Sequence, residues 1–479
     1  MNSLRITLRE EVIGKILSNH IVESGIVANM IIFRYHQAHK PIVEQETIEG
    51  HSVRAMYLLT ATADLSIIDE QGFGTKYREA LERLWTNMVD RKMYLTGGIG
   101  AIKQWEGFGI DYFLPQGTDE GGCYSETCAA IGVMMFAERM LQIDLDAKYA
   151  DILELCLYNA FLTGMSQDGK AFTYVNQLAS SPTNPSKREG WFECACCPPN
   201  VARTLGYLGG YFWTWKGTGS SKKAVEINVH LYASAALEFE VNGVKIQLTQ
   251  RTNWPWSGNA DFELTTSDKI DVTIRLRIPR WANEYKVSPI FCLSLHLNSI
   301  PNHLTYIQII PSPSNSSSTR GYVTLDSNYL ATNRTFHLSI PMKPRLIRPH
   351  PYTNQPIAAV GRGPIIYCVE DADNAWVTDH FKSLVFDIKV PLQESEASIA
   401  GAEEVEKEKY VAITAEKAAL FLRDTGSFMN ATSGAGGLKL RVENDHREDL
   451  RFVPYYARAN RGGKGMMRVG LRVGPFEEV

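Results

Sequence analysis

The hydrophobic pattern of this chain changes its period part of the way along. From His51 to about Phe212, apolar residues recur three and four positions apart, a spacing typical of helices that pack on a core. After about residue 224 they alternate with polar residues, which is typical of half-buried antiparallel strands. The pattern therefore predicts a multidomain α+β protein in which a helical domain precedes one or two antiparallel β-sandwich domains.

The two periods also predict individual elements. One helix opens at His51, and four more are expected over residues 75–89, 126–141, 147–164 and 198–212. Strands are expected over residues 225–231, 244–248, 270–276 and 336–340. Three stretches interrupt the β pattern: a long loop insertion at 288–318, a charged linker or excursion at 394–409, and a Gly-rich loop at 433–437.

Length and charge limit the function classes. A chain of 479 residues with 44% hydrophobic content exceeds what one core usually supports, and we predict a catalytic domain over 1–218 and a jelly-roll-like β region over 219–479. The net charge is −4 and both signs are interspersed, so we expect no nucleic-acid partner and no membrane partner. Charged residues interrupt the N-terminal apolar stretch, so we expect no signal peptide there. The cysteines are clustered rather than spaced as a disulfide framework, which suits a reducing compartment. These features favour a cytoplasmic protein.

Two clusters carry most of the chemistry that the sequence offers. Glu126 and Cys128 lie in one segment, and Cys194, Cys196 and Cys197 lie together sixty-odd residues later. Thiolates and a carboxylate are donors that suit Zn²⁺. Glu126 and Cys128 can converge only at an irregular helix start, and the prolines that follow predict an extended Cys197. Two alternatives are buried structural cysteines and a redox switch, although the spacing is not Cys-x-x-Cys.

Short motifs make the interpretation more specific. In the helical part these are Thr96-Gly97-Gly98-Ile99-Gly100, Trp105-Glu106-Gly107-Phe108, Leu114-Pro115, Glu126-Thr127-Cys128-Ala129, Tyr174-Val175-Asn176 and Cys194-Ala195-Cys196-Cys197-Pro198-Pro199-Asn200. In the β part they are Trp254-Pro255-Trp256, Leu276-Arg277-Ile278-Pro279, Arg362-Gly363-Pro364-Ile365-Ile366-Tyr367 and Val453-Pro454-Tyr455-Tyr456-Ala457. In this order they resemble glycoside hydrolase family 127, typified by β-L-arabinofuranosidases, over about residues 40–285 and 320–475.

The resemblance implies a retaining glycoside hydrolase that releases β-L-arabinofuranose or a related sugar from glycans. It implies Zn²⁺ held by four ligands, with Cys196 as nucleophile and Glu106 as general acid/base. It also implies that His51 binds the sugar, although a histidine at a helix start can equally be a cap. The four zinc ligands that it implies are Glu126, Cys128, Cys196 and Cys197.

Two further residues are candidates for substrate binding. Tyr174 can donate to a sugar hydroxyl or fill a strand core. Glu154 lies on an otherwise apolar helix, where a carboxylate needs a ligand or a buried partner unless it faces solvent. Trp105 and Phe108 flank Glu106 and are expected to form an apolar wall that raises its pKa.

The chain also departs from the resemblance. Family members carry an (α/α)6 barrel with a long helical stretch ahead of the segment around His51, whereas only about fifty residues precede His51 here. The catalytic barrel is therefore expected to lack its N-terminal part, and a homodimer is one way to cover the exposed helices. The alternative function is an inactive truncated paralogue with a structural zinc and a β-sandwich that binds carbohydrate or a partner. Cys123 and Glu193 are additional groups near the predicted ligands.

Overall fold

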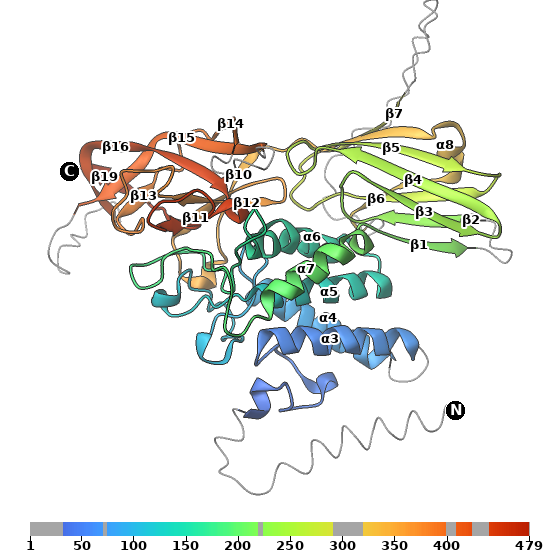
Figure 1. Cartoon of the computed structure of the whole chain (residues 1–479), viewed down its shortest axis with the longest axis horizontal. Coiled ribbons are helices and arrows are strands. Elements are labelled where there is room, and N and C mark those ends of the chain that lie inside the picture. Colours follow the sequence, from blue (N-terminus) through green and yellow to red (C-terminus); the bar gives the residue numbers. More distant parts are fainter. Residues whose placement is uncertain are drawn as a thin grey trace, which may run out of the picture.

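The computed structural model describes residues 32–69, 74–218, 224–290, 320–398, 409–423 and 440–478. A helical part is followed by two β-rich parts, which lie next to each other along one side of it (Figure 1). Within the described residues, no helix is long and apolar enough to cross a membrane.

Five α-helices lie entirely within the described residues of the helical part. They are α3 (Ser52–Ile68), α4 (Gly74–Arg91), α5 (Thr127–Ile143), α6 (Ala147–Leu155) and α7 (Cys197–Tyr207). Helix α5 lies at the centre, because nearly every side chain along it is buried and its apolar residues belong to a core shared with α3, α4 and α6. Short 3-10 turns lie before, between and after them, at Ile42–Glu44, Lys103–Trp105, Thr118–Glu120, Leu162–Gly164 and Leu208–Tyr211.

The helix predicted over 147–164 is regular only as far as Leu155. It continues as a π-helical turn, Cys156–Phe161. Asn159 lies in this turn and its amide donates to the carbonyl oxygens of Leu155 and Pro364, while its side-chain oxygen accepts from the backbone N–H of Ile366. The widened turn therefore attaches the helical part to the C-terminal part, a connection that helical periodicity does not reveal.

The first β-rich part is a sandwich of two sheets. The four-stranded sheet has the order β1 (Trp213–Thr218), β2 (Ala224–Val229), β6 (Asp271–Arg277), β8 (Tyr322–Leu325). The five-stranded sheet has the order β3 (Ala235–Val241), β4 (Val244–Thr252), β5 (Asn259–Thr266), β9 (Thr335–Ser339), β7 (Lys286–Pro289), and a short helix α8 (Ser327–Thr332) precedes β9. Both sheets contribute to one buried cluster, which includes Ile227, Ile274, Phe262 and Phe336.

One pairing in this sandwich contradicts the expected antiparallel arrangement. Strands β2 and β6 run parallel, with Ile227 opposite Ile274. Between them the chain builds β3, β4 and β5 in the other sheet and returns in the same direction. Alternation of apolar residues reports which face of a strand is buried and not the direction of its neighbour, so the sequence pattern could not distinguish the two.

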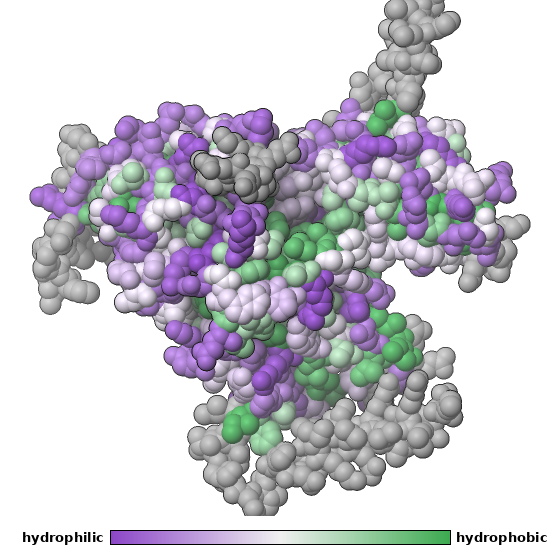
Figure 2. Space-filling view, viewed as in Figure 1, coloured by the Kyte–Doolittle hydropathy of each residue, from purple (hydrophilic) through white to green (hydrophobic). Residues whose placement is uncertain are grey.

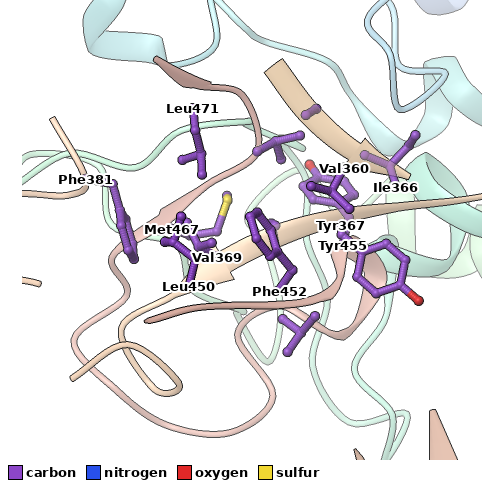
Figure 3. Close-up of a cluster of buried hydrophobic side chains, with 14 of the residues drawn as sticks. Val360, Ile366, Tyr367, Val369, Phe381, Leu450, Phe452, Tyr455, Met467 and Leu471 are labelled. Carbon is purple, nitrogen blue, oxygen red and sulfur yellow. The ribbon is translucent and has the colours of Figure 1, made fainter. Parts of the chain in front are cut away.

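The second β-rich part is built around one large sheet rather than a second sandwich. Its order is β10 (Pro344–Ile347), β11 (Ile357–Arg362), β18 (Leu471–Arg472), β13 (Leu384–Phe386), β15 (Lys409–Leu422), β16 (Leu440–Pro454), β12 (Ile365–Glu370), β17 (Met467–Arg468). Strand β14 (Gln393–Ser398) pairs with β15, and β19 (Phe476–Glu478) pairs with β16. Because β11 also pairs with β12, the sheet closes on itself around a core that includes Val360, Tyr367, Phe452 and Leu471 (Figure 3).

The three predicted interruptions have different outcomes. Residues 393–398 form the strand β14, so this end of the charged stretch is not the expected helix-prone linker; its mostly exposed side chains are typical of a sheet edge. Residues 288–290 are described and partly belong to β7, whereas the rest of the 288–318 insertion lies outside the described residues. The Gly-rich stretch at 433–437 also lies outside them.

Candidate active site

Two helix N-termini meet at the centre of the helical part. Glu126 is the N-cap of α5 and Cys128 lies in its first turn, while Cys196 is the N-cap of α7 and Cys197 is its first residue. The start of α5 is held by an extended segment, because Thr127 donates to the carbonyl oxygens of Tyr174 (3.0 Å) and Thr173 (2.7 Å). The positive ends of two helix dipoles therefore converge where anionic side chains would be stabilised.

The four predicted metal ligands come together at these helix starts. Their ligand atoms all lie within 4.8 Å of one another. The Sγ atoms of Cys128 and Cys197 are 3.5 Å apart, those of Cys196 and Cys197 are 3.8 Å apart, and Cys196 Sγ is 3.4 Å from Glu126 Oε1.

The predicted extended conformation of Cys197 is wrong. Helix α7 begins at this residue, with Pro198 and Pro199 in its first turn, where their missing N–H groups leave no helical hydrogen bond unmade. The two adjacent thiols reach one point because Cys196 precedes the helix and Cys197 opens it.

Charge and burial in this cluster favour a bound cation. Burial raises the pKa of Glu126 to about 8, and its Oε2 atom is enclosed with no hydrogen-bond partner in the part of the chain that the structure describes. Hydrogen bonding with Cys196 raises the pKa of Cys128 to about 12, while hydrogen bonds from Cys128 and Cys197 lower the pKa of Cys196. A buried carboxyl group and three thiols at one point fit a metal ion that accepts sulfur and oxygen donors.

A second pair of side chains lies beside the cluster. The ring nitrogen Nδ1 of His51 accepts from the backbone N–H of Val53 at 3.2 Å, so Nε2 carries the proton and donates to Glu106 Oε2 at 3.1 Å. His51 is thus the N-cap of α3 as well as the partner of Glu106, and burial lowers its pKa. The atoms of His51, Glu106 and Glu126 also lie within 4.8 Å of one another, which connects the pair to the cluster.

The backbone holds Glu106 in an uncommon conformation. Its φ of 53° and ψ of 37° place it in the left-handed region, where it caps the 3-10 turn Lys103–Trp105. Its carbonyl oxygen accepts from both the N–H and the hydroxyl of Ser52 at the start of α3. The adjacent Gly107 allows this approach, because a Cβ there would overlap the carbonyl oxygen of Gly50.

The expected apolar wall around Glu106 has a different composition. The indole of Trp105 donates to the carbonyl oxygen of Phe108 and closes the loop, and the carboxylate side chain remains 39% exposed. The partners of the carboxylate are His51 and Tyr124. Burial, together with hydrogen bonding to Tyr174 and Glu106, raises the pKa of Tyr124. Sequence reasoning missed Tyr124, because Ser125, between it and Glu126, has a left-handed backbone (φ 39°) that no residue pattern indicates.

Tyr174 connects the two groups. Its hydroxyl lies 3.4 Å from Cys196 Sγ, and its ring lies edge-on to Tyr124 with centroids 6.1 Å apart. Both groups open into a pocket of about 660 Å³, a size typical of small-ligand sites. The pocket is lined by Tyr35, His51, Val53, Arg54, Tyr57, Glu106, Glu126, Cys128, Tyr174, Cys194, Cys196, Pro199, Asn200 and Arg203.

Glu154 is the one predicted substrate-binding residue that the structure does not bring to this pocket. Glu154 is only 1% exposed. Its carboxylate forms an ion pair at 2.7 Å with Arg277, a fully buried residue of β6, and accepts a hydrogen bond from the indole of Trp281. Arg277 also binds Asp151 at 2.6 Å. The partner of this carboxylate is therefore the β-sandwich and not a ligand, which satisfies the need for a buried partner.

Of the other described cysteines, Cys123, Cys156 and Cys368 are buried outside the cluster, whereas Cys194 interacts with Cys196. Cys123 is buried and donates to the carbonyl oxygen of Asn176, so it is a bystander rather than a competing ligand. Cys194 is exposed at the pocket. None of the seven described cysteines forms a disulfide.

Comparisons with known proteins agree with this arrangement. Three models of one family match consecutive segments: the "Beta-L-arabinofuranosidase, GH127 catalytic domain" at residues 15–210, the middle domain at 226–289 and the "Glycoside hydrolase family 127 C-terminal domain" at 344–472. A curated relative, the non-reducing end β-L-arabinofuranosidase of Bifidobacterium longum subsp. longum, is 33% identical over 355 residues. These residues are 71% of this chain and 48% of the relative, so the chain spans about half the length of that protein.

Solved structures are similar over most of the chain. A GH127 β-L-arabinofuranosidase from Geobacillus stearothermophilus T6 has a TM-score of 0.73 and 31% identity, and the match covers 92% of this chain and 63% of that one. A second GH127 β-arabinofuranosidase has a TM-score of 0.70 at the same identity and coverage. With consecutive catalytic, middle and C-terminal domain matches and the folds to go with them, this chain belongs to glycoside hydrolase family 127.

Proposed function

We propose that this protein hydrolyses the bond between a non-reducing-end β-L-arabinofuranose, or a closely related sugar, and the rest of a glycan, with retention of configuration. The observation that carries the proposal is the pairing of a thiol and a carboxyl group at one pocket: Cys196 on the start of α7 and Glu106 on the loop before α5. The printed activity of the Bifidobacterium relative supports the choice of sugar.

We infer that Zn²⁺ is the ion that Glu126, Cys128, Cys196 and Cys197 would hold. A site with three sulfur donors and one oxygen donor binds zinc in preference to magnesium or calcium. A zinc ion bound there would keep the thiols ionised at neutral pH.

The reaction then uses two side chains of the chain itself. In the first step the Cys196 thiolate attacks the anomeric carbon, the bond from that carbon to the leaving oxygen breaks, and Glu106 gives its proton to that oxygen. In the second step Glu106 takes a proton from a water molecule, which attacks the same carbon and breaks the carbon–sulfur bond. Two inversions give net retention.

His51 and Tyr174 position these groups and the sugar. The His51 Nε2–H donates to Glu106 and orients its carboxylate, and the same nitrogen lies at the pocket, within reach of a hydroxyl of a bound sugar. The Tyr174 hydroxyl lies beside the Cys196 sulfur, where it donates to the thiolate before attack or to the ring oxygen of the sugar after it.

We also propose that helices α3 to α7 belong to an (α/α)6-type arrangement and that two copies of the chain associate. Exposed apolar side chains on α3 and α7, among them Tyr57, Leu58, Leu205 and Tyr207, support a partner for these helices. Light scattering over a range of concentrations tests this association, and a monomer at all of them would contradict it.

The mechanism is tested with the zinc-loaded protein and methyl β-L-arabinofuranoside. Cys196→Ser and Glu106→Gln are expected to lower kcat at least a thousandfold with the thermal midpoint of unfolding nearly unchanged for Glu106→Gln. Cys123→Ala, at a buried thiol outside the cluster, is the control and should retain activity. NMR of the fresh product should show the β anomer first. Full activity in Cys196→Ser would refute the thiolate mechanism.

The same assay separates the proposal from the non-catalytic alternative. A protein that binds one zinc ion per chain and binds arabinofuranosides, but hydrolyses none of them, would be an inactive paralogue with a structural metal. Zinc stoichiometry by mass spectrometry and sugar affinity by calorimetry provide these two readouts.

A further inference from the structure

One large aromatic side chain is exposed on the segment that leads into the pocket wall and has no role in the chemistry described above. Trp191 is 65% exposed and lies in the loop that leads to α7. Three residues further on, Cys194 lines the pocket, and Cys196 follows. Most other exposed large apolar residues of the described chain, such as Ile68 and Ile110, lie outside the pocket lining and away from this loop.

Neighbouring residues hold the Trp191 ring in place. It packs edge-on against Phe172, with centroids 6.3 Å apart and an interplanar angle of 82°. Phe172 is itself anchored, because its backbone exchanges two hydrogen bonds with Glu189, at 2.8 and 2.9 Å. An edge-on contact of this kind uses one side of the indole and leaves aromatic surface open to solvent.

The next residue ties this loop to the pocket wall. Phe192 packs edge-on against Tyr174, with centroids 5.6 Å apart, and the Tyr174 hydroxyl contacts Cys196 Sγ. Two consecutive aromatic residues thus have opposite roles: Phe192 supports a pocket residue and Trp191 presents its surface outside the pocket. A ring fixed in this way loses little conformational entropy when a ligand covers it.

We propose that Trp191 is a stacking platform for the first sugar of the leaving group. This inference rests on the proposed function, in which the terminal sugar occupies the pocket and the remainder of the glycan extends past its rim. A pyranose or furanose ring presents a face of C–H groups, which packs on a flat apolar indole while its hydroxyls stay in water. Lys187 and Glu189, which form an ion pair at 2.7 Å, precede Trp191 in the chain, and Glu193 follows it.

The test compares two substrates that differ only outside the pocket. Methyl β-L-arabinofuranoside has methanol as its leaving group, whereas a β-L-arabinofuranosyl disaccharide has a sugar there. Trp191→Ala is expected to raise KM for the disaccharide roughly threefold to tenfold with kcat nearly unchanged, and to leave both parameters for the methyl glycoside within a factor of two. Trp191→Phe should restore most of the lost affinity.

Trp215→Ala is the matched control. Trp215 is also an exposed tryptophan, but it lies on β1 and stacks on Phe239 in the sandwich, so its removal should change neither substrate's KM. Equal changes for the two substrates in Trp191→Ala, or no change for the disaccharide, would overturn the platform while leaving the proposed function intact. A concentration-dependent dimer that Trp191→Ala dissociates would also overturn it, because a second copy would then cover the indole.

A binding measurement keeps the two proposals separable. In the Glu106→Gln variant, titration with the disaccharide should change the tryptophan fluorescence. In the double variant that also carries Trp191→Ala, this change should be absent. This readout does not require turnover. If the wild-type protein hydrolyses neither substrate, a Trp191-dependent fluorescence change still supports the platform, and its absence refutes it.

Discussion

Loss of the Arg277 side chain should lower the stability of the protein strongly. Its guanidinium is fully buried between the helical part and the β-sandwich and binds Asp151 and Glu154 of α6 at 2.6 and 2.7 Å. Its Nε also donates to the carbonyl oxygen of His230 at 2.5 Å. Arg277→Met would remove the cation that pairs with the buried Glu154 and the partly buried Asp151. Breaking a buried pair in this way costs about 3–5 kcal/mol.

The cost appears as a shift in thermal unfolding. For a domain of the size of the helical part, each 1 kcal/mol lowers the midpoint by roughly 2–4 °C, so Arg277→Met should lower it by roughly 6–20 °C. Arg275→Met is a matched control on the same strand, because Arg275 binds Glu226 in a partly exposed pair whose loss costs about 1 kcal/mol or less. Differential scanning calorimetry of the three proteins measures both effects.

A further variant tests the position of Glu154 as a structural residue. Arg277→Met combined with Asp151→Leu and Glu154→Leu removes all three charges and should recover most of the lost stability, since an apolar replacement of similar volume is often neutral. Glu154→Leu alone should lower stability without changing KM. A loss of less than about 1 kcal/mol in Arg277→Met, or a raised KM with normal stability in Glu154→Leu, would refute this account of the interface.

Three other measurements test the site and its support. Removing the metal with a chelator should abolish hydrolysis and lower stability by about 2.7 kcal/mol relative to protein with free zinc at one hundred times Kd; zinc should restore both and magnesium neither. Burial lowers the pKa of His230 to about 3 in the folded state, below its unfolded value of 6.5. As the pH falls below 6.5, His230 therefore takes up a proton in the unfolded state but not in the folded one. Stability should therefore be complete above pH 6.5 and fall by about 1.4 kcal/mol per pH unit below it, and His230→Gln should flatten that slope in calorimetry. Asn159→Ala should lower the free energy of unfolding, measured in denaturant, by about 2 kcal/mol or more, because it removes the acceptor of the Ile366 N–H and the donor to two carbonyl oxygens; an unchanged free energy would contradict its docking role.

The sequence predicts the elements of this fold better than their connections. Helical spacing locates both ends of α5 to within two residues and the start of α7 to within one, because a buried helix face repeats along the chain; the predicted end of α7 is too late, since Leu208–Tyr211 form a 3-10 turn. The parallel pairing of β2 with β6 and the closure of the C-terminal sheet depend on contacts between distant strands, for which local alternation carries no signal. The π-helical turn around Asn159 likewise depends on Pro364 and Ile366, two hundred residues away in the sequence.

The candidate site shows the same limit. Unusual residue types at short spacing indicated the Glu126 and cysteine cluster, and the structure brings all four side chains together. Glu154 had the same apparent signal, a carboxylate on an apolar helix face, but its partner Arg277 comes from a strand of another domain. Tyr124 and Arg203 gave no signal, because a tyrosine or an arginine near a motif is common in any protein.

The left-handed backbone of Glu106 has an evolutionary consequence. A residue with a Cβ in this region is less stable than glycine by roughly 1–2 kcal/mol, so Glu106→Gly would relieve strain while deleting the carboxylate. The most accessible stabilising mutation at this position is therefore an inactivating one. Copies of the gene released from selection for turnover should drift toward glycine or asparagine at position 106, and these two residues would mark family members that have retained the fold and lost the acid.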